Sequence, residues 1–247
     1  MIRIAALGDP HAGLDSAGSL RPALADLAER ADLLLVAGDL TRHGDPEEAA
    51  VLAAELADVG VPTIAVLGNH DHHADQPHLV RKVVEEAGVV VLEGESTVVQ
   101  VGGVRVGVAG AKGFGGGFQG ACGSEFGEPE MKAFVRHTRG IADRLSAALA
   151  ALEAQGTDRR VVVLHFSPVA ETLVGERLEI YPFLGSYLLA EAVDRVGADL
   201  VVHGHAHAGS ERGTTPGGVP VRNVSQPVIG AAYRIYCLGG PDQPACD

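Results

Sequence analysis

Short apolar runs rich in Val, Ile and Leu recur along the chain and alternate with longer stretches that have helical spacing of apolar residues. Such runs are typical of buried strands, and their alternation with helices predicts an α/β fold with a parallel sheet in the first half. We expect strands near Ile2–Leu7, Leu33–Ala37, Thr63–Leu67, Val89–Leu92, Thr97–Val101, Arg105–Ala109, Arg160–Leu164, Leu200–Val202, Val219–Val224 and Arg234–Leu238. We expect helices near Leu20–Ala31, Pro46–Val59, Pro77–Ala87, Pro129–Gln155 and Leu184–Val196.

No linker or fixed-period repeat divides the chain, so residues 1–247 are expected to form a single domain, with a frayed tail from residue 239. The stretch VVQVGGVRVGVAG predicts a hairpin with a Gly-Gly turn. Residues 113–127 contain seven Gly and predict an irregular, mobile loop that would act as a lid.

The same loop contains GGGFQG, which satisfies the GxGxxG pattern of dinucleotide-binding proteins. That function needs a helix to begin within the motif. Helix signals begin only at Pro129, so a flexible loop is the better interpretation and a dinucleotide-dependent oxidoreductase is a minor alternative.

Composition restricts the class of partner. The chain has 247 residues, 46% of them hydrophobic, and a formal net charge of −13. That charge has the wrong sign for a protein that binds nucleic acid over an extended surface. Bound divalent ions would nevertheless create a local positive site within this field.

The three cysteines form no CxxC pair, so their spacing suggests neither a disulfide framework nor a thiolate zinc site. The N-terminal sequence MIRIAALGDPH does not resemble a signal peptide, and no apolar run is long enough to span a membrane. We therefore expect a protein of a reducing, cytoplasmic compartment with no membrane partner. The sequence does not predict an oligomeric state.

Chemically active side chains collect directly after the predicted strands. In open α/β sheets ligands bind at the carboxyl ends of strands, where the following loops converge, so polar groups at those ends should share one crevice. His203, in contrast, lies on the strand side of Gly204, and we expect it to be a core histidine. The collected residues are Asp9, His11, Asp39, Asn69, His70, His165, His205 and His207.

This set predicts a metal site. Nitrogen and oxygen donors without thiolates suit borderline divalent ions such as Mn, Fe or Zn, whereas four imidazoles argue against Mg or Ca. Seven protein donors exceed the three or four of one open catalytic site, which favours two ions sharing a bridging carboxylate. In Asp9-Pro10-His11 and in His205-Ala206-His207 the paired residues are two apart, so an extended segment would present both on one side.

The order of these motifs resembles that of the calcineurin-like metallophosphoesterase superfamily, whose pattern is DxH, GDxx, GNH[DE], a lone His and GHxH. All five are intact here across residues 9–207. They are Asp9-Pro10-His11, Gly38-Asp39, Gly68-Asn69-His70-Asp71, His165 in VVVLHFSP, and Gly204-His205-Ala206-His207.

The resemblance implies a four-layer αββα sandwich, two mixed β-sheets flanked by helices. It also implies that Asp9, His11 and His207 bind a first metal ion and that Asp39 bridges both ions. Asn69, His165 and His205 would bind the second ion. His70 would lie near the leaving-group oxygen, and Asn69 and His70 would contact substrate.

The implied reaction is hydrolysis of a small phosphate ester. A hydroxide bridging the two ions would attack phosphorus, and a protonated His70 would assist the departing alkoxide. The compact size and the GNHD motif resemble small bacterial phosphodiesterases, so we favour a phosphodiester or cyclic nucleotide as substrate. A phosphomonoesterase and a catalytically silent binding module of the same fold are the alternatives.

The sequence departs from the protein phosphatases of the superfamily, which have GDxVDRG where this chain has GDLTRHG. Arg42 and His43 occupy the positions of the Asp that orients the catalytic His and of the phosphate-binding Arg. This argues against a protein phosphatase and leaves the orienting partner of His70 open, with Asp71 as one candidate. We expect His43 to lie at the rim and contact substrate.

Overall fold

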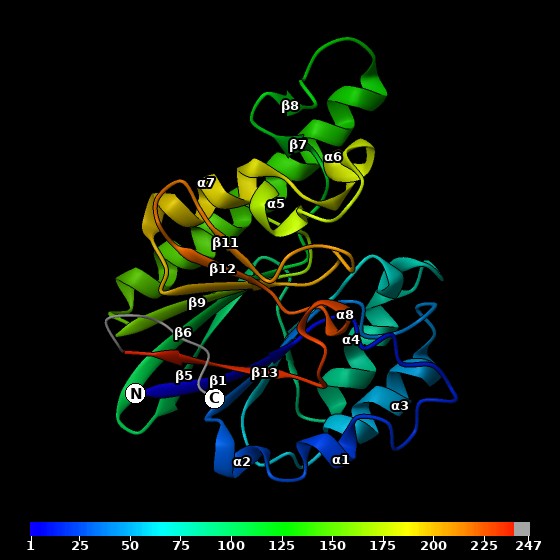
Figure 1. Cartoon of the computed structure of the whole chain (residues 1–247), viewed down its shortest axis with the longest axis vertical. Coiled ribbons are helices and arrows are strands. Elements are labelled where there is room, and N and C mark those ends of the chain that lie inside the picture. The colour runs from blue at the N-terminus through cyan, green and yellow to red at the C-terminus, as the bar shows by residue number, and fades with distance from the viewer. Residues whose placement is uncertain (240–247) are drawn as a thin grey trace.

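The computed structural model describes residues 1–239, and its two large sheets pack face to face between layers of helices (Figure 1). The first sheet has the strand order β13 (Arg234–Leu238), β1 (Ile2–Leu7), β2 (Leu33–Ala37), β3 (Thr63–Val66) and β4 (Val90–Val91). Strands β1 to β4 run parallel and β13 is antiparallel to β1. The parallel strands therefore place the ends of β1, β2 and β3 at one edge.

The second sheet has the order β11 (Arg212–Thr214), β12 (Pro220–Asn223), β10 (Leu200–His203), β9 (Arg159–Leu164), β6 (Val104–Ala111) and β5 (Glu95–Val101). Its four central strands are parallel, while β5 and β11 pair antiparallel at the two edges. The β5–β6 pair is the hairpin that the Gly-Gly turn predicts. The ends of β9 and β10 lie side by side because these strands are neighbours.

Helices cover the outer face of each sheet (Figure 1). The first sheet is covered by α1 (Arg21–Leu24), α2 (Leu27–Arg30), α3 (Pro46–Leu56) and α4 (Pro77–Glu86). The second is covered by α5 (Pro129–Ala154) and α7 (Tyr187–Val196). The shorter helices are η1 (His70–His72), η2 (Ala170–Leu173), η3 (Leu178–Ile180), α6 (Tyr181–Leu184) and α8 (Gln226–Ile229).

A central core fills the space between the two sheets. Ile4 and Leu35 of the first sheet belong to the same buried cluster as Val108, Val161 and Val202 of the second. Neighbouring residues along these strands point outward to the helices, because side chains alternate across a sheet. The predicted αββα sandwich is thereby confirmed.

Two predicted helices differ from the structure. The structure divides the stretch expected as one helix from Leu20 into α1 and α2. Asp26 directly precedes α2, and Asp disfavours a helix interior because its side chain competes for the hydrogen bonds of nearby backbone groups. The helix expected from Leu184 begins at Tyr187, because the Ser186 side chain accepts a hydrogen bond from Leu188 N and caps it.

The Gly-rich stretch is more ordered than an irregular loop. Strands β7 (Gly117–Phe118) and β8 (Ala121–Cys122) pair antiparallel within it, and Gly117 N donates to Gly185 O. No helix begins in GGGFQG, since α5 starts at Pro129, so the dinucleotide alternative is not supported. The structure does not test a lid function.

Three further expectations concern the cysteines, a membrane-spanning segment and the C-terminal tail. Cys122 is free and exposed, and the expected reducing compartment stays a prediction. Within residues 1–239, no helix combines the length and apolar character needed to cross a membrane. The predicted frayed tail falls almost entirely on residues 240–247, outside the described residues.

Candidate metal centre

The five motifs follow the carboxyl ends of β1, β2, β3, β9 and β10, as the strand pattern predicts. Backbone hydrogen bonds join the loops that carry them. His11 N donates to Asp39 O at 3.0 Å, and Gly204 N donates to His165 O at 3.2 Å. The ends of both sheets therefore converge on one place, and each loop helps to fix the next.

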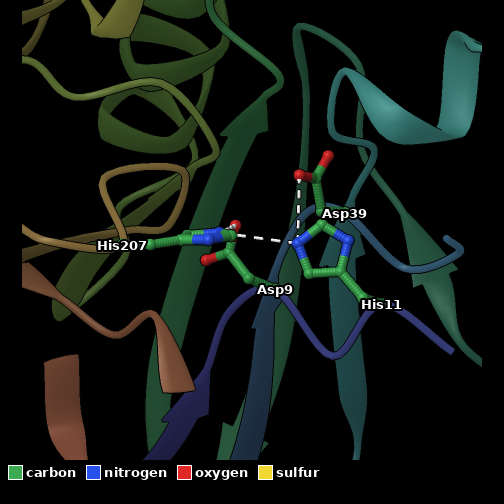
Figure 2. Close-up of side chains that lie close together, drawn as sticks. All are labelled: Asp9, His11, Asp39 and His207. Atoms are coloured by element: carbon green, nitrogen blue, oxygen red, sulfur yellow. Dashed lines mark hydrogen bonds and ion pairs between the residues drawn. The ribbon is translucent and has the colours of Figure 1, made fainter. Parts of the chain in front are cut away.

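The first group of side chains comprises Asp9, His11, Asp39 and His207, whose ligand atoms all lie within 4.8 Å of one another. Figure 2 shows these side chains pointing toward one another from three loops. His207 Nε2 lies 3.0 Å from Asp9 Oδ1, and His11 Nε2 lies 3.5 Å from His207 Nε2 and 3.6 Å from Asp39 Oδ2. Two carboxylates and two imidazoles around one point form a donor set suited to a divalent ion.

The second group comprises Asp39, His165 and His205, again with ligand atoms within 4.8 Å of one another. Asn69 adjoins it, since its Oδ1 lies 2.9 Å from His165 Nε2. His165 Nε2 also lies 3.2 Å from Asp39 Oδ1. Asp39 belongs to both groups, so its two oxygens can serve two ions at once.

A hydrogen bond to a backbone carbonyl fixes the orientation of the His165 ring. Its Nδ1 lies 2.9 Å from the carbonyl oxygen of Ala37, which can only accept a hydrogen bond. Nδ1 must therefore carry the proton, and Nε2 faces Asn69 and Asp39 with its lone pair free. Metal-binding histidines are commonly held in this way by a second partner.

Burial controls the protonation of the site. It lowers the pKa of His165 to about 4 and that of His205 to about 3, so both imidazoles are neutral near pH 7, the form that binds metal. Burial raises the pKa of Asp39, assisted by the charge of Asp9. At Asp9 burial acts in the same direction, but the hydrogen bond and the charge of His207 outweigh it and hold the pKa below its ordinary value.

The backbone is strained at the candidate ligands. Asp9, His11, Asp39 and His205 have φ angles of 59°, 42°, 50° and 69°, in the left-handed region that non-Gly residues rarely occupy. Such strain persists only where surrounding structure imposes it, and it is concentrated at functional sites. The expectation of extended DxH and HxH segments is therefore wrong. His205 and His207 in fact enter different groups.

Two glycines allow the loops to approach closely. A Cβ at Gly204 would lie 2.5 Å from Asp9 Oδ2, and a Cβ at Gly68 would overlap Asp39. At both positions a carboxylate from another motif fills the space that a side chain would need, so only glycine fits there.

His70 lies at the edge of the centre with its side chain 42% exposed. Its backbone N donates to Asp39 Oδ1 at 2.9 Å, its Nε2 lies 4.0 Å from Asp39 Oδ2, and its ring contacts the His11 ring edge-on at 4.5 Å. Its Nδ1 lies 2.8 Å from the carbonyl oxygen of Arg42. The partner that orients His70 is thus a backbone carbonyl and not Asp71.

Asp71 instead joins two of the loops. Its fully buried carboxylate accepts hydrogen bonds from the backbone N of Leu40, Thr41 and Gly68 and from the Thr41 hydroxyl. Burial raises its pKa to about 6, against the effect of these hydrogen bonds. Asp71 therefore holds the loop that carries Asp39 against the loop that carries Asn69 and His70.

The remaining histidines lie outside the two groups. His43 Nδ1 contacts Glu48 Oε1 at 2.7 Å, its ring lies near that of His73, and its predicted contact with substrate stays a prediction. His203 is fully buried between Thr172 Oγ1 and Gly204 O, each 2.8 Å away, as expected of a core histidine.

Sequence reasoning missed Ser225 and Asn223. Ser225 Oγ donates to Asp9 Oδ2 at 2.5 Å, and Asn223 Nδ2 donates to Ala206 O at 2.7 Å within the HxH loop. Asn223 Oδ1 in turn accepts from Ser225 N. Polar residues at the end of the predicted strand Val219–Val224 were the available signal, although Ser and Asn at such a position usually indicate only a turn.

The sequence profile of the calcineurin-like phosphoesterase family matches residues 2–209. None of the curated proteins matches the sequence significantly. Among solved structures, the chain is similar to phosphopantetheinyl hydrolase from Mycobacterium tuberculosis, with 20% identity, a TM-score of 0.62, and coverage of 90% of this chain and 88% of that one. It is also similar to the protein TT1561 of Thermus thermophilus, with 19% identity, a TM-score of 0.55, and coverage of 95% of this chain and 93% of that one. These likenesses show a shared fold.

Proposed function

Because the chain belongs to the calcineurin-like phosphoesterase family, we propose that it is a dinuclear metal-dependent phosphodiesterase acting on a small soluble phosphate ester or a cyclic nucleotide. The observation that carries this proposal is the position of Asp39, which is shared by two groups of candidate ligands. A bridging carboxylate is what a pair of neighbouring divalent ions requires. When bound, two such ions polarise phosphate oxygens and generate a nucleophile from water near neutral pH.

The proposed ligands follow the two groups. Asp39 binds both ions, Asp9, His11 and His207 complete the first site, and Asn69, His165 and His205 complete the second. The donor set is nitrogen-rich and contains no thiolate, which supports Mn, Fe or Zn over Mg or Ca. Two ions carry four positive charges against two carboxylates, so the centre attracts an anionic phosphate ester.

His70 is the residue proposed to transfer the proton to the leaving group. Because its Nδ1 is held by the Arg42 carbonyl, its Nε2 is the atom free to donate. That atom lies 4.0 Å from Asp39 Oδ2, at the edge of the centre and partly open to solvent. Asn69, beside the second group, and His70, at the edge of the centre, are the residues proposed to contact the phosphate and the departing oxygen of the substrate. Proton transfer of this kind contributes roughly 10²–10⁴-fold to rate.

The diester preference rests on the compact size and the GNHD motif, which resemble those of small bacterial phosphodiesterases of the superfamily. A phosphomonoesterase would use the same centre. A silent binding module is less well supported, because each candidate ligand position keeps a residue able to bind metal. The net charge of −13 supports a small substrate over an extended nucleic-acid surface.

The test is hydrolysis of bis-(p-nitrophenyl) phosphate and p-nitrophenyl phosphate, measured side by side. The full chain is stripped with EDTA and reloaded with Mn²⁺, and Asp39→Ala serves as the control. Metal-dependent cleavage of the diester that Asp39→Ala abolishes is the expected result. Preference for the monoester would identify a phosphatase, and no hydrolysis of either ester with metal demonstrably bound would favour the binding module.

A further inference from the structure

Lys112, one of three lysines in the chain, follows β6 beside the candidate metal centre. Its carbonyl oxygen accepts hydrogen bonds from the backbone N of His165 and of Phe166. The side chain is half-buried, and its charge interacts with Glu93, Asp39 and Asp71, none of which forms an ion pair with it. Within the described part of the chain, the Lys112 ammonium group forms no ion pair or hydrogen bond.

Two aromatic rings lie near this ammonium group. Lys112 Nζ lies 5.2 Å from the centre of the Phe114 ring and 5.5 Å from that of Phe166. The Phe166 ring in turn packs on the His205 ring, with centres 4.2 Å apart. The Phe166 ring therefore contacts both the Lys112 ammonium group and a candidate metal ligand, which places this cation beside the second group of ligands.

His72 adds a second polar group without a partner. Its Nε2 is buried and has no hydrogen-bond partner among the described residues. Burial lowers the pKa of His72 to about 4, and the charge of Lys112 acts in the same direction, so His72 is a neutral imidazole near pH 7. The His137 ring meets Phe114 edge-on at 4.7 Å. One cation, which follows β6, and two imidazoles, from η1 and α5, thus lie near one another.

Glu93, the acidic group that acts most strongly on the charge of Lys112, does not pair with it. Glu93 Oε1 accepts a hydrogen bond from Leu67 N at 3.0 Å, and burial raises the pKa of Glu93 to about 7. Asp39 is committed to the metal centre and Asp71 to the loop backbone. A partly buried cation without a close counter-charge is unfavourable, so an anionic ligand would gain more here than at an exposed lysine.

We propose that Lys112 and His72 form an anion subsite beside the Asn69 and His165 side of the metal centre. It takes a second anionic group of the substrate, a carboxylate or a further phosphate, while the ester to be cleaved lies at the metal centre. This inference rests on the proposed function and narrows its substrate class to esters with two anionic groups.

The test measures binding by isothermal titration calorimetry, using the full chain loaded with Mn²⁺. The probes are propylphosphonate, 3-phosphonopropionate and 1,3-propanediphosphonate, which share one phosphonate and differ in the group at the far end. We expect at least one of the two probes with an anionic group at each end to bind about tenfold more tightly than propylphosphonate. The probe with the larger gain distinguishes a carboxylate from a phosphate as the natural second group.

Lys112→Met should reduce the preference for probes with two anionic groups to less than about twofold. Lys112→Arg should retain this preference, because it keeps the positive charge. Lys82→Met is the matched control, because Lys82 is exposed on α4 and pairs with Glu86. A preference that survives in Lys112→Met, or no preference in the wild-type chain, would overturn the subsite. Because binding is measured separately from turnover, a chain that hydrolyses no ester but keeps the preference would disprove only the proposed function.

Discussion

The Nδ1 atom of His70 lies 2.8 Å from the carbonyl oxygen of Arg42. A carbonyl can only accept, so the proton on Nδ1 is fixed and Nε2 points toward Asp39. The superfamily's protein phosphatases are expected to orient the same histidine with an aspartate side chain at position 42. Here the side chain has been replaced, and the backbone of the same residue provides the hydrogen bond.

This relationship predicts that Arg42→Ala changes kcat for bis-(p-nitrophenyl) phosphate by less than about threefold, because the carbonyl remains. His70→Ala should lower kcat by roughly 10²–10³-fold, since the proton donor is removed. Both variants are assayed with Mn²⁺ at saturating substrate. If Arg42→Ala is as impaired as His70→Ala, the Arg42 side chain, which pairs with Asp15 in this structure, takes part directly.

The position of Asp39 in both groups predicts how many metal ions each variant retains. After dialysis against limiting metal, the wild-type chain should retain about two ions and His207→Ala should retain about one. Asp39→Ala should retain fewer than one, because only Asp39 serves both groups. Inductively coupled plasma mass spectrometry of the dialysed proteins measures this. Equal losses in His207→Ala and Asp39→Ala would contradict a shared ligand.

The fold was largely predictable because buried strands leave a strong signal. The run LLLVA is apolar throughout and forms β2 with the predicted bounds. The candidate ligands were also predictable, because polar residues at strand ends are few and the sheet topology brings those ends together. Strand β11 was missed because its sequence, Arg-Gly-Thr, has no apolar run and it pairs only at an edge.

What sequence reasoning could not provide is the local geometry of the loops. The DxH and HxH spacing suggested extended segments, whereas Asp9 and His205 adopt left-handed backbone conformations imposed by contacts from other motifs. The orienting partner of His70 was equally hidden, because a backbone carbonyl has no residue type to recognise. Such features depend on tertiary contacts between segments far apart in the chain.

Gly204 is predicted to tolerate no side chain. In Gly204→Ala the new Cβ would meet Asp9 Oδ2 and, at 2.7 Å, the Ala37 carbonyl, so we expect a loss of about 1–3 kcal/mol in the free energy of unfolding. Chemical denaturation of the metal-free protein measures it. The control is Gly140→Ala in the interior of α5, where nothing lies closer than the Arg144 guanidinium at 3.8 Å. That substitution should stabilise by roughly 0.5–1 kcal/mol.

The raised pKa of Glu93 predicts that the free energy of unfolding depends on pH. Its pKa is about 7 in the folded chain and near its ordinary 4.5 when unfolded, so the folded state binds more protons between these values. Stability from this group is therefore present below pH 4.5 and is lost as the pH rises through 7. Glu93→Gln keeps the acceptor for Leu67 N and should raise the free energy of unfolding by about 1–3 kcal/mol at pH 8.

At pH 4 the same Glu93→Gln substitution should have little effect, because the wild-type carboxyl is then protonated when folded. Denaturant unfolding of the metal-free proteins at both pH values provides the comparison. A difference between wild type and variant that is the same at pH 4 and pH 8 would mean that packing, and not ionisation, accounts for it.

Ser225 is predicted to support the first ion without touching it. Its hydroxyl donates to Asp9 Oδ2, whereas Oδ1 faces His207 and is the oxygen that would hold an ion. Removing such an outer partner typically costs 10–100-fold in metal affinity. Ser225→Ala should therefore weaken Mn²⁺ binding by about that factor, measured by competition with a chelator.

Ser146→Ala is the matched control for Ser225→Ala, since Ser146 is a buried serine on α5 that accepts a hydrogen bond from Arg195 away from the centre. It should leave Mn²⁺ affinity within about twofold of wild type. Since Ser225 bonds only one of the two carboxylates, only one of the two binding events should weaken. If both ions are lost together, Ser225 stabilises the fold of the whole centre and not the orientation of Asp9.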